Sequence, residues 1–377
     1  MERAYVALLH GDRSEFLLYA LLLGFRLRQF DAGCDRLLLL ARKSYMSATD
    51  RACLDKFWRV KEVEAVDCPA ADKTSYKRHR YVFSKLHVFG LPCKKVVFFD
   101  LDVVVLGSPL ELFGVEAPAA MYHGRRRYRR NARHGALLPP EAFLCGGTLS
   151  GCINAGLMRI DPPATELERD VLVGSMIAAA ASLDSRDQTY LPEQYFLARV
   201  VRGWRHIDVR WNCEVCPSYY VAYGGEVVQA ESELPSDWLR LGSDQASLRA
   251  RVCMFHFSGT WLEPWWFLHL RAEAGHDFVR HQLEHRDPRG LVALAVYEWL
   301  AGMEEMRESF MFTEQEKASI RAHTSHLART ANDWWEANDV CVLCGKLVYF
   351  GSVLGRCEEC HIRSCASQTE TGGRGGR

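Results

Sequence analysis

The stretch Lys94-Lys-Val-Val-Phe-Phe-Asp-Leu-Asp-Val-Val-Val-Leu106 decides the fold. Its β-branched and aromatic residues are almost unbroken and lie between Pro92 and Pro109, which predicts one strand buried on both faces, as in parallel sheets. Asp100 and Asp102 interrupt this apolar run. Because an unpaired carboxylate is costly to bury, we expect both at the carboxyl edge of the sheet or around a cation.

The spacing of two residues places both carboxylates on one side of an extended chain. Oxygen ligands at the carboxyl edge of a parallel sheet suit Mg²⁺ or Mn²⁺, and α/β folds bind nucleotides at that edge. Alternatively, one aspartate caps the next turn and the other faces water. His256, where a later strand meets a glycine turn, is either a third ligand or a satisfied core histidine.

The overall composition is that of a globular protein. The chain has 377 residues, of which 48% are hydrophobic and 25% are charged, enough for two or three domains. Its 47 basic residues balance its 47 acidic ones, so no global charge points to nucleic acid or to an anionic membrane. No stretch has the length of a bilayer span and no secretory signal is recognisable, so we expect a cytoplasmic protein.

Strand and helix patterns alternate before the central stretch. We expect strands at residues 4–9, 36–40 and 60–66, and helices at residues 16–30 and 50–57. This order predicts an α/β fold with a Rossmann-like, mostly parallel sheet. The Gly-x-Gly-x-x-Gly fingerprint of dinucleotide binding is absent.

Several polar residues elsewhere are candidates for a ligand site. Lys85, on a helix before the central strand, either faces solvent or contacts phosphate oxygens. Asn154 and Gly156 interrupt an apolar strand, where the amide either ties down a bulge or binds a sugar hydroxyl and the glycine permits a close approach. Glu193 and Gln194 open a helix, and capping alone would explain them.

Two other clusters carry charge or thiols. Residues 125–133 are the most basic stretch, either an exposed loop or a site that captures an acidic acceptor or a phosphate. Two cysteine pairs twelve residues apart have the spacing of a four-thiolate Zn²⁺ site, with His361 and Cys365 as alternates: Cys341, Cys344, Cys357 and Cys360. We interpret Cys213 and Cys216 as unrelated thiols.

Five motifs occur in an order typical of one family: Phe83-Ser-Lys-Leu-His-Val-Phe89, Phe99-Asp-Leu-Asp-Val103, Ile153-Asn-Ala-Gly-Leu-Met158, Pro192-Glu-Gln-Tyr-Phe-Leu197 and His256-Phe-Ser-Gly-Thr-Trp-Leu-Glu-Pro-Trp265. Over residues 4–267 the chain resembles the glycogenin-like family 8 glycosyltransferases. The resemblance implies a GT-A fold and retaining transfer of a hexose from a UDP-sugar. It also implies Mn²⁺ or Mg²⁺ at the diphosphate.

The resemblance also implies roles for single residues. Asp100, Asp102 and His256 would hold the metal, and Glu193 and Gln194 would be the catalytic pair near the anomeric carbon. Lys77, Arg78 or Arg80 would assist Lys85 at the phosphates, and Leu8 would line the uracil pocket. The donor site would comprise Leu8, Lys85, Asp100, Leu101, Asp102, Asn154, Ala155, Gly156, Gln194 and Gly259.

Three features depart from the family pattern. Leu262-Glu263 stands where members usually carry a lysine before Pro-Trp, so one phosphate contact is missing or comes from the basic stretch. Asp187-Gln188, with Asp184 upstream, fits the acidic-Gln motif nearly as well as Glu193-Gln194. The pattern around Tyr219 and Tyr220 is poor, and we do not predict self-glucosylation.

We expect four parts in the chain: a glycosyltransferase domain at residues 1–267, a helical extension at 268–338, a zinc-ribbon-like module at 339–365 and a disordered tail at 366–377. The leading hypothesis is a metal-dependent retaining hexosyltransferase that acts on a saccharide, polyol or protein. The alternative is a degenerate family member that acts as a binding or scaffold protein through its zinc module and basic stretch. A protein is the expected partner of the zinc module, and nucleic acid is not expected.

Overall fold

The computed structural model describes residues 1–11, 13–42, 46–67, 80–123, 132–143, 152–183, 192–215, 245–258, 263–268, 270–282 and 290–337. Within these ranges the main element is a seven-stranded sheet with the order β3-β2-β1-β4-β7-β6-β8. Its first four strands pair in parallel: β1 (Arg3–Leu9), β2 (Asp35–Ala41), β3 (Arg59–Val63) and β4 (Lys95–Phe99).

The other half of this sheet is mixed. β7 (Cys152–Ile160) runs antiparallel to both β4 and β6 (Ala119–His123), and β8 (Arg205–His206) runs parallel to β6. The expected α/β fold with a mixed, mostly parallel GT-A-type sheet is therefore confirmed, including strands at the three ranges predicted before the central stretch.

The central stretch forms two strands instead of one. β4 ends at Phe99, and β5 (Val103–Val105) belongs to a second sheet with the order β5-β10-β9, in which β10 is Met254–His256 and β9 is Cys213–Glu214. The backbone changes partner across the turn between them, where Asp100 N donates to Gly156 O and Phe257 N donates to Asp102 O, both at 2.8 Å. The prediction of one continuous strand was wrong, because the turn carries both carboxylates out of the buried strand.

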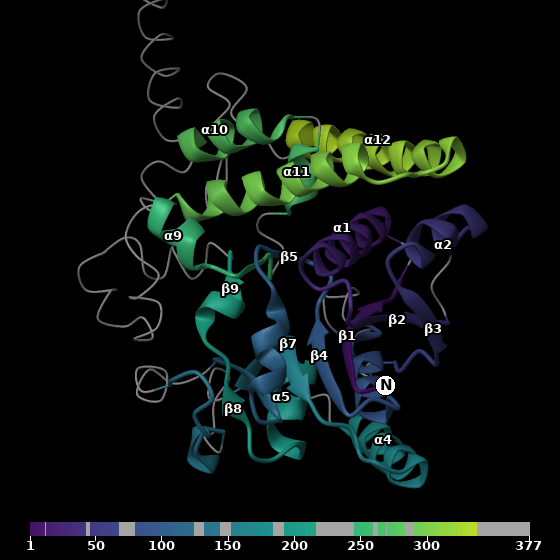
Figure 1. The fold of residues 1–377 in the computed structure, drawn as a ribbon, viewed down its shortest axis with the longest axis vertical. Coiled ribbons are helices and arrows are strands. Elements are labelled where there is room, and N and C mark those ends of the chain that lie inside the picture. Colours follow the sequence, from purple (N-terminus) through teal and green to yellow (C-terminus); the bar gives the residue numbers. More distant parts are fainter. Residues whose placement is uncertain are drawn as a thin grey trace, which may run out of the picture.

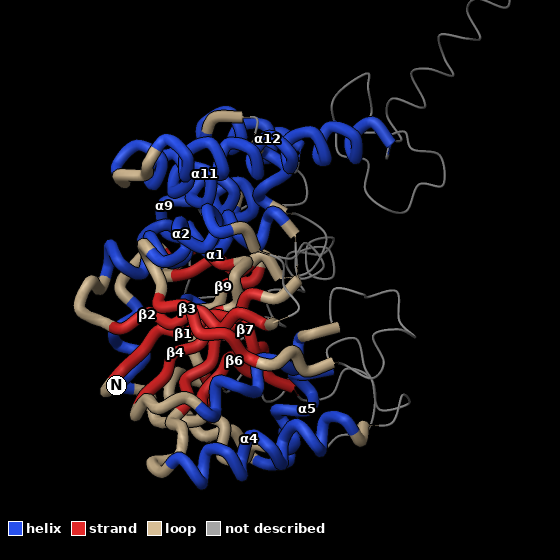
Figure 2. The backbone as a smooth tube through the Cα atoms, turned by 90° about the vertical axis from the view of Figure 1, so that its right-hand side faces the viewer, coloured by secondary structure: helices blue, strands red, loops and turns tan. Residues whose placement is uncertain are grey.

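Helices cover both faces of the large sheet, as Figure 2 shows. Above it lie α1 (Ser14–Phe30) and α2 (Ala48–Asp55), and below it lie α4 (Glu166–Ala181) and α5 (Pro192–Val200), with the 3₁₀ helix η2 (Val82–Gly90) on the same side as α4. Strand β4 contributes side chains to the apolar cores on both faces of the sheet, because successive side chains of a strand point to opposite faces. Val97 and Phe99 join the core beneath α1, and Val96 and Phe98 join the core against η2 and α5.

A further helical layer packs on α1. It consists of α10 (Ala272–Gln282), α11 (Leu291–Ser309) and α12 (Glu314–Ala337), which lie beyond α1 from the sheet in Figure 1. Helix α1 is buried on nearly all sides, because this layer covers the side that faces away from the sheet. The described residues also include α9 (Gln245–Arg251), η3 (Pro109–Gly114), η4 (Pro140–Ala142), η5 (Val209–Trp211) and η6 (Pro264–Phe267).

The spacing in Thr313-Glu-Gln-Glu316 predicts a capping box, which the structure confirms at the start of α12. Glu316 N donates to Thr313 Oγ1 at 3.3 Å, and Thr313 N donates to Glu316 Oε2 at 2.7 Å. These two bonds satisfy backbone donors that a helix start otherwise leaves unpaired. The helical region from α10 to α12 shares one apolar core with α1.

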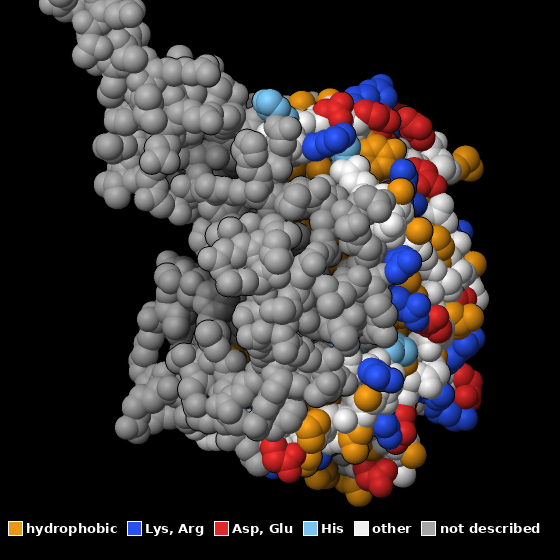
Figure 3. Space-filling view, turned by 90° about the vertical axis from the view of Figure 1, so that its left-hand side faces the viewer, with side chains coloured by type: hydrophobic (Ala, Val, Ile, Leu, Met, Phe, Trp, Pro, Cys, Tyr) orange, Lys and Arg blue, Asp and Glu red, His pale blue; other side chains and the backbone are white. Residues whose placement is uncertain are grey.

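In the described part of the chain, no helix combines the length and the apolar character that crossing a membrane requires. Figure 3 shows acidic and basic side chains interspersed over the described part of one face. The zinc module, the tail and all but the last two residues of the basic stretch lie outside the described residues, and the domain boundaries stay predictions.

Candidate active site

The turn between β4 and β5 presents two carboxylates at the edge of the large sheet. The side chains of Asp100 and Asp102 are each 29% exposed, whereas Leu101 between them turns into the apolar core. The pattern of polar, apolar, polar places both aspartates on the same side of the chain. The expected location at the carboxyl end of the strand is therefore confirmed.

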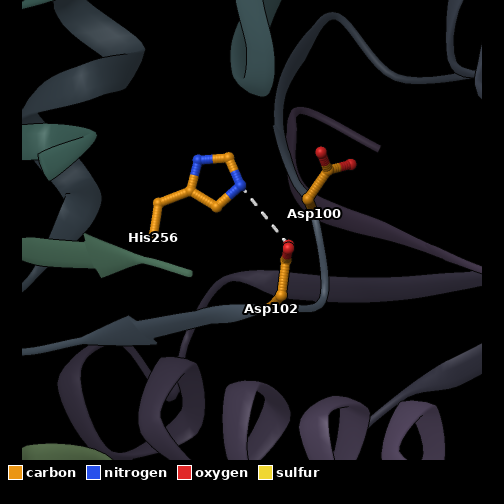
Figure 4. A group of neighbouring side chains, drawn as sticks. All are labelled: Asp100, Asp102 and His256. Atoms are coloured by element: carbon orange, nitrogen blue, oxygen red, sulfur yellow. Dashed lines mark ion pairs between the residues drawn. The ribbon is translucent and has the colours of Figure 1, made fainter. Parts of the chain in front are cut away.

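His256 reaches the same point from a distant part of the sequence. It is the last residue of β10, which pairs antiparallel with β5 so that His256 lies opposite Val103. Its Nε2 is 3.4 Å from Asp102 Oδ1, as the dashed line in Figure 4 shows. One ligand atom from each of Asp100, Asp102 and His256 lies within 4.8 Å of the other two.

This donor set fits a divalent cation. Two ligands of an ion bound at about 2.1 Å lie about 3 to 4.2 Å apart, so small side-chain rotations bring all three atoms to an ion. Carboxylate oxygens suit both Mg²⁺ and Mn²⁺, and the imidazole nitrogen favours Mn²⁺.

The directions in which the pKa values of Asp102 and His256 shift also fit a cation site. Burial lowers the pKa of His256, but the charge and hydrogen bond of Asp102, together with the charges of Asp100 and Glu214, outweigh burial and raise the pKa overall. Burial raises the pKa of Asp102, but the charge and hydrogen bond of His256, together with a backbone hydrogen bond and the charge of Lys85, outweigh burial and lower that pKa. A cation that binds Nε2 therefore replaces a proton held there by Asp102.

Two buried asparagines orient the imidazole. His256 Nδ1 lies 2.8 Å from Asn212 Oδ1, and because an amide oxygen only accepts, Nδ1 carries the proton and Nε2 faces Asp102. Asn212 Nδ2 donates to Asn154 Oδ1 at 3.0 Å, which also accepts from Gly156 N at 2.9 Å. The amide at residue 154, predicted either to tie down the strand or to bind sugar, thus secures the backbone and the ligand set together.

Asn212→Ala is expected to weaken Mn²⁺ binding about 10- to 100-fold, because outer hydrogen bonds hold a ligand histidine in its tautomer and orientation. Asn212→Asp keeps an acceptor for His256 Nδ1 and is expected to lose much less Mn²⁺ affinity than Asn212→Ala. Free Mn²⁺ measured by electron paramagnetic resonance during titration checks both values. An equal loss in the two variants would contradict the orienting role and point to the contact with Asn154 instead.

Gly156 leaves room for the imidazole. A Cβ at this position would collide with His256 Cε1 and would come within 2.8 Å of Nδ1 and 2.9 Å of Nε2. The ring cannot retreat without breaking its bond to Asn212. The close approach that the sequence predicted at this glycine is thus made by a side chain of the protein itself.

Gly156→Ala is therefore expected to displace His256 and to weaken Mn²⁺ binding at least about tenfold, the scale set by loss of ligand orientation. Gly174→Ala on α4 is the matched control. A Cβ there meets nothing within 4 Å, and alanine favours a helix over glycine by about 1 kcal/mol. Calorimetric titration with Mn²⁺ and a melting curve for each variant test this, and wild-type affinity in Gly156→Ala would refute it.

Lys85 on η2 is buried among acidic groups, so the solvent-exposed alternative is wrong. Its Nζ lies 2.9 Å from Asp100 Oδ1 and 3.6 Å from Glu193 Oε1, and donates to Ala155 O at 3.3 Å. Burial opposes its charge, but Asp100, Glu193 and Asp102 together outweigh burial and raise the pKa of Lys85. The lysine thus links the acidic turn to the start of α5.

Glu193 is 4% exposed. Burial raises its pKa, and Lys85 opposes that rise. Among the described residues its Oε2 has no hydrogen-bond partner, which leaves one carboxylate oxygen for a ligand. Gln194 Oε1 accepts from Ala155 N at 3.4 Å, so the side chains of both residues make contacts beyond the start of α5.

The other predicted residues divide into two groups. Leu8 is buried at the end of β1, and Arg80 donates to Asp67 at 3.1 Å. The remaining candidates lie outside the described residues: Lys77, Arg78, Asp184, Asp187, Gln188, Cys216, Tyr219, Tyr220, Gly259 and Leu262. The choice between Glu193-Gln194 and Asp187-Gln188 as the acidic-Gln motif stays open.

Glu263 stands beside the position of the family's lysine. Tyr19 on α1 donates to Glu263 Oε2 at 2.5 Å. Burial raises the pKa of Glu263 to about 8, and Asp102 contributes in the same direction. The chain therefore places a carboxyl group held by α1 next to the position where the family carries a cation.

Sequence reasoning missed Asn212, Glu214 and His123. Asn212 and Glu214 are buried polar residues on either side of Cys213, and Glu214 contacts Asn154 and Ser258, each at 2.7 Å. The signal was the alternation of polar and apolar residues from Asp208 to Val215, which is typical of a strand with one buried face. We interpreted that run only for its cysteines.

Comparisons with known proteins give distant similarities. No family model matches the chain. An uncharacterized protein, R707, of Acanthamoeba polyphaga mimivirus is 26% identical over 295 residues, which are 74% of this chain and 98% of the relative.

Three solved glycosyltransferases have similar structures. Galactosyltransferase LgtC in complex with donor and acceptor sugar analogs is 14% identical, and the match covers 85% of this chain and 100% of that one with a TM-score of 0.49. GlyE of Streptococcus pneumoniae is 14% identical, with coverages of 70% and 57% and a TM-score of 0.44. Mouse xyloside xylosyltransferase 1 is 16% identical, with coverages of 68% and 98% and a TM-score of 0.41.

Proposed function

We propose that the protein is a metal-dependent glycosyltransferase of the glycogenin-like family 8 type, which moves a hexose from a UDP-sugar to an acceptor hydroxyl with retention of configuration. The observation that carries the proposal is the convergence of Asp100, Asp102 and His256 beside the buried pair of Lys85 and Glu193. A sugar diphosphate needs both halves of this arrangement. Its phosphates need positive charge, and its anomeric carbon needs an oxygen nearby.

The reaction breaks the bond between the anomeric carbon and the β-phosphate oxygen, and the electron pair leaves with the diphosphate. The acceptor oxygen forms the new bond to that carbon, and its proton passes to the departing phosphate. Mn²⁺ held by Asp100, Asp102 and His256 would supply positive charge at the diphosphate.

The chain's own residues would position the donor sugar and stabilise the charge that develops on it. Lys85 holds Asp100 in place from within the protein and fixes Glu193 at a short distance from it. The free Oε2 of Glu193 would stabilise the positive charge that develops at the anomeric carbon. Gln194 and Ala155 would hold the sugar from the side of α5.

The zinc module at Cys341, Cys344, Cys357 and Cys360 stays part of the proposal. Coordination by four thiolates would supply the folding energy of so small a unit. The scaffold alternative draws support from Glu263, because a carboxyl group at the position next to the expected lysine removes one contact with phosphate.

The test uses the full chain with Mn²⁺ and a panel of UDP-sugars. Release of UDP from one member of the panel, abolished by a chelator and restored by Mn²⁺, is the expected result. Calorimetric titration with UDP and Mn²⁺ accompanies it, so that donor binding is measured without the acceptor. If no UDP-sugar is bound or turned over with Mn²⁺ present, the enzyme hypothesis fails and the scaffold alternative stands.

A further inference from the structure

Glu214 is a buried carboxylate whose two oxygens differ in their hydrogen bonding. It ends β9, where it lies opposite His256 of β10, and it is 4% exposed. Its Oε1 accepts two hydrogen bonds of 2.7 Å, from Asn154 Nδ2 and from Ser258 Oγ. Its Oε2 has no hydrogen-bond partner among the described residues.

An imidazole at the end of β6 lies near that oxygen. His123 Nε2 lies 4.0 Å from Glu214 Oε2, which is too far for a hydrogen bond. A carboxylate oxygen can only accept, so what completes this site must bring a proton donor. A hydroxyl group meets the requirement, because it donates to the carboxylate while its lone pairs accept from the imidazole.

The site is joined to the acidic turn through Asn154. The side chain of Asn154 donates to Glu214 Oε1 and accepts from Asn212, which in turn holds His256. Glu214 also lies directly opposite His256, one of the predicted metal ligands, where β9 pairs with β10. We therefore expect a ligand that occupies the turn to reach toward Glu214.

We propose that Glu214 Oε2 and His123 Nε2 bind a hydroxyl group of a sugar ring, either on the transferred hexose or on the acceptor. This rests on the proposed function for the identity of the sugar, and it assigns a recognition role to two residues outside the five family motifs. The carboxylate selects for a hydroxyl at one ring position, because a deoxy sugar leaves the buried oxygen without a donor.

Glu214→Gln is the direct test, since the amide keeps an acceptor for Asn154 and Ser258 and replaces Oε2 with a donor. His123→Phe removes the imidazole that would donate to the same hydroxyl, and it leaves the hydrogen bond between Asn154 and Glu214 in place. Glu298→Gln on α11 is the matched buried-carboxylate control. The probes are Mn²⁺, UDP, UDP-glucose, UDP-galactose and a panel of methyl glycosides, all titrated calorimetrically.

For a hydroxyl on the transferred hexose, both site variants are expected to bind the preferred UDP-sugar at least about tenfold more weakly than wild type, with unchanged affinity for UDP and Mn²⁺. For an acceptor hydroxyl, affinity for the UDP-sugars stays unchanged, and affinity for a methyl glycoside in the presence of Mn²⁺ and UDP falls by the same factor. Glu298→Gln is expected to match wild type throughout.

Other outcomes overturn the inference. Unchanged affinities in both site variants would refute it while leaving the proposed function intact. A loss of Mn²⁺ affinity in Glu214→Gln would instead make the residue a support for Asn154. If wild type binds methyl glycosides through Glu214 but binds no UDP-sugar, the proposed function fails and the subsite stands. If wild type binds neither, both fail.

Discussion

Asp102→Ala is expected to lower Mn²⁺-dependent UDP release by about a thousandfold, the scale of losing a main electrostatic contact to the transition state. Asp102 lies close to both other predicted ligands, with His256 Nε2 at 3.4 Å and Asp100 two residues before it in the turn. Its removal also releases His256 from the partner that raises its pKa. The measurement is UDP release at saturating donor, with Mn²⁺ affinity determined in parallel.

The matched control for this variant is Asp170→Ala, which removes an exposed carboxylate from α4. It is expected to retain wild-type turnover and Mn²⁺ affinity. A melting curve for each protein separates loss of the site from loss of the fold. UDP release that persists in Asp102→Ala would remove this residue from the metal site and with it the central element of the proposal.

Much of the fold could be predicted because local patterns decide it. The strands at β1, β2 and β7 are apolar runs bounded by turns, and the start of α12 carries a capping box in its sequence. The division of the central stretch could not be predicted in the same way. Val96 to Phe99 and Val103 to Val105 have the same apolar character, but the second segment pairs with β10, about 150 residues later.

In the candidate site, too, some residues could be predicted from the sequence and others only from the fold. Asp100, Asp102 and His256 carry ligand chemistry that is visible in the residue types, and the structure brings them together as expected. Asn212 and Glu214 gain their importance only when β9 pairs with β10. Burial is what turns an amide or a carboxylate into a group that must have a partner, and burial of this kind depends on contacts between distant segments.

Lys85→Met is expected to lower the free energy of unfolding by about 3–5 kcal/mol, because removing one partner of a buried ion pair leaves the other charge uncompensated. The side chains of Lys85 and Glu193 are 4% and 5% exposed, so water cannot replace the lost ammonium group. Asp100, at 29% exposure, is better solvated and contributes less to the loss. Urea denaturation followed by circular dichroism measures the change.

The double variant Lys85→Met/Glu193→Gln separates charge from packing. Neutralising Glu193 removes the uncompensated charge, so the double variant is expected to regain a large part of the stability lost in Lys85→Met, whereas turnover stays lost in both. Lys317→Met, which removes a half-exposed lysine from α12, is the control and is expected to unfold close to wild type. If the double variant is no more stable than Lys85→Met, the lysine stabilises the fold through its packing against Phe98, and the electrostatic link between the acidic turn and α5 must be abandoned.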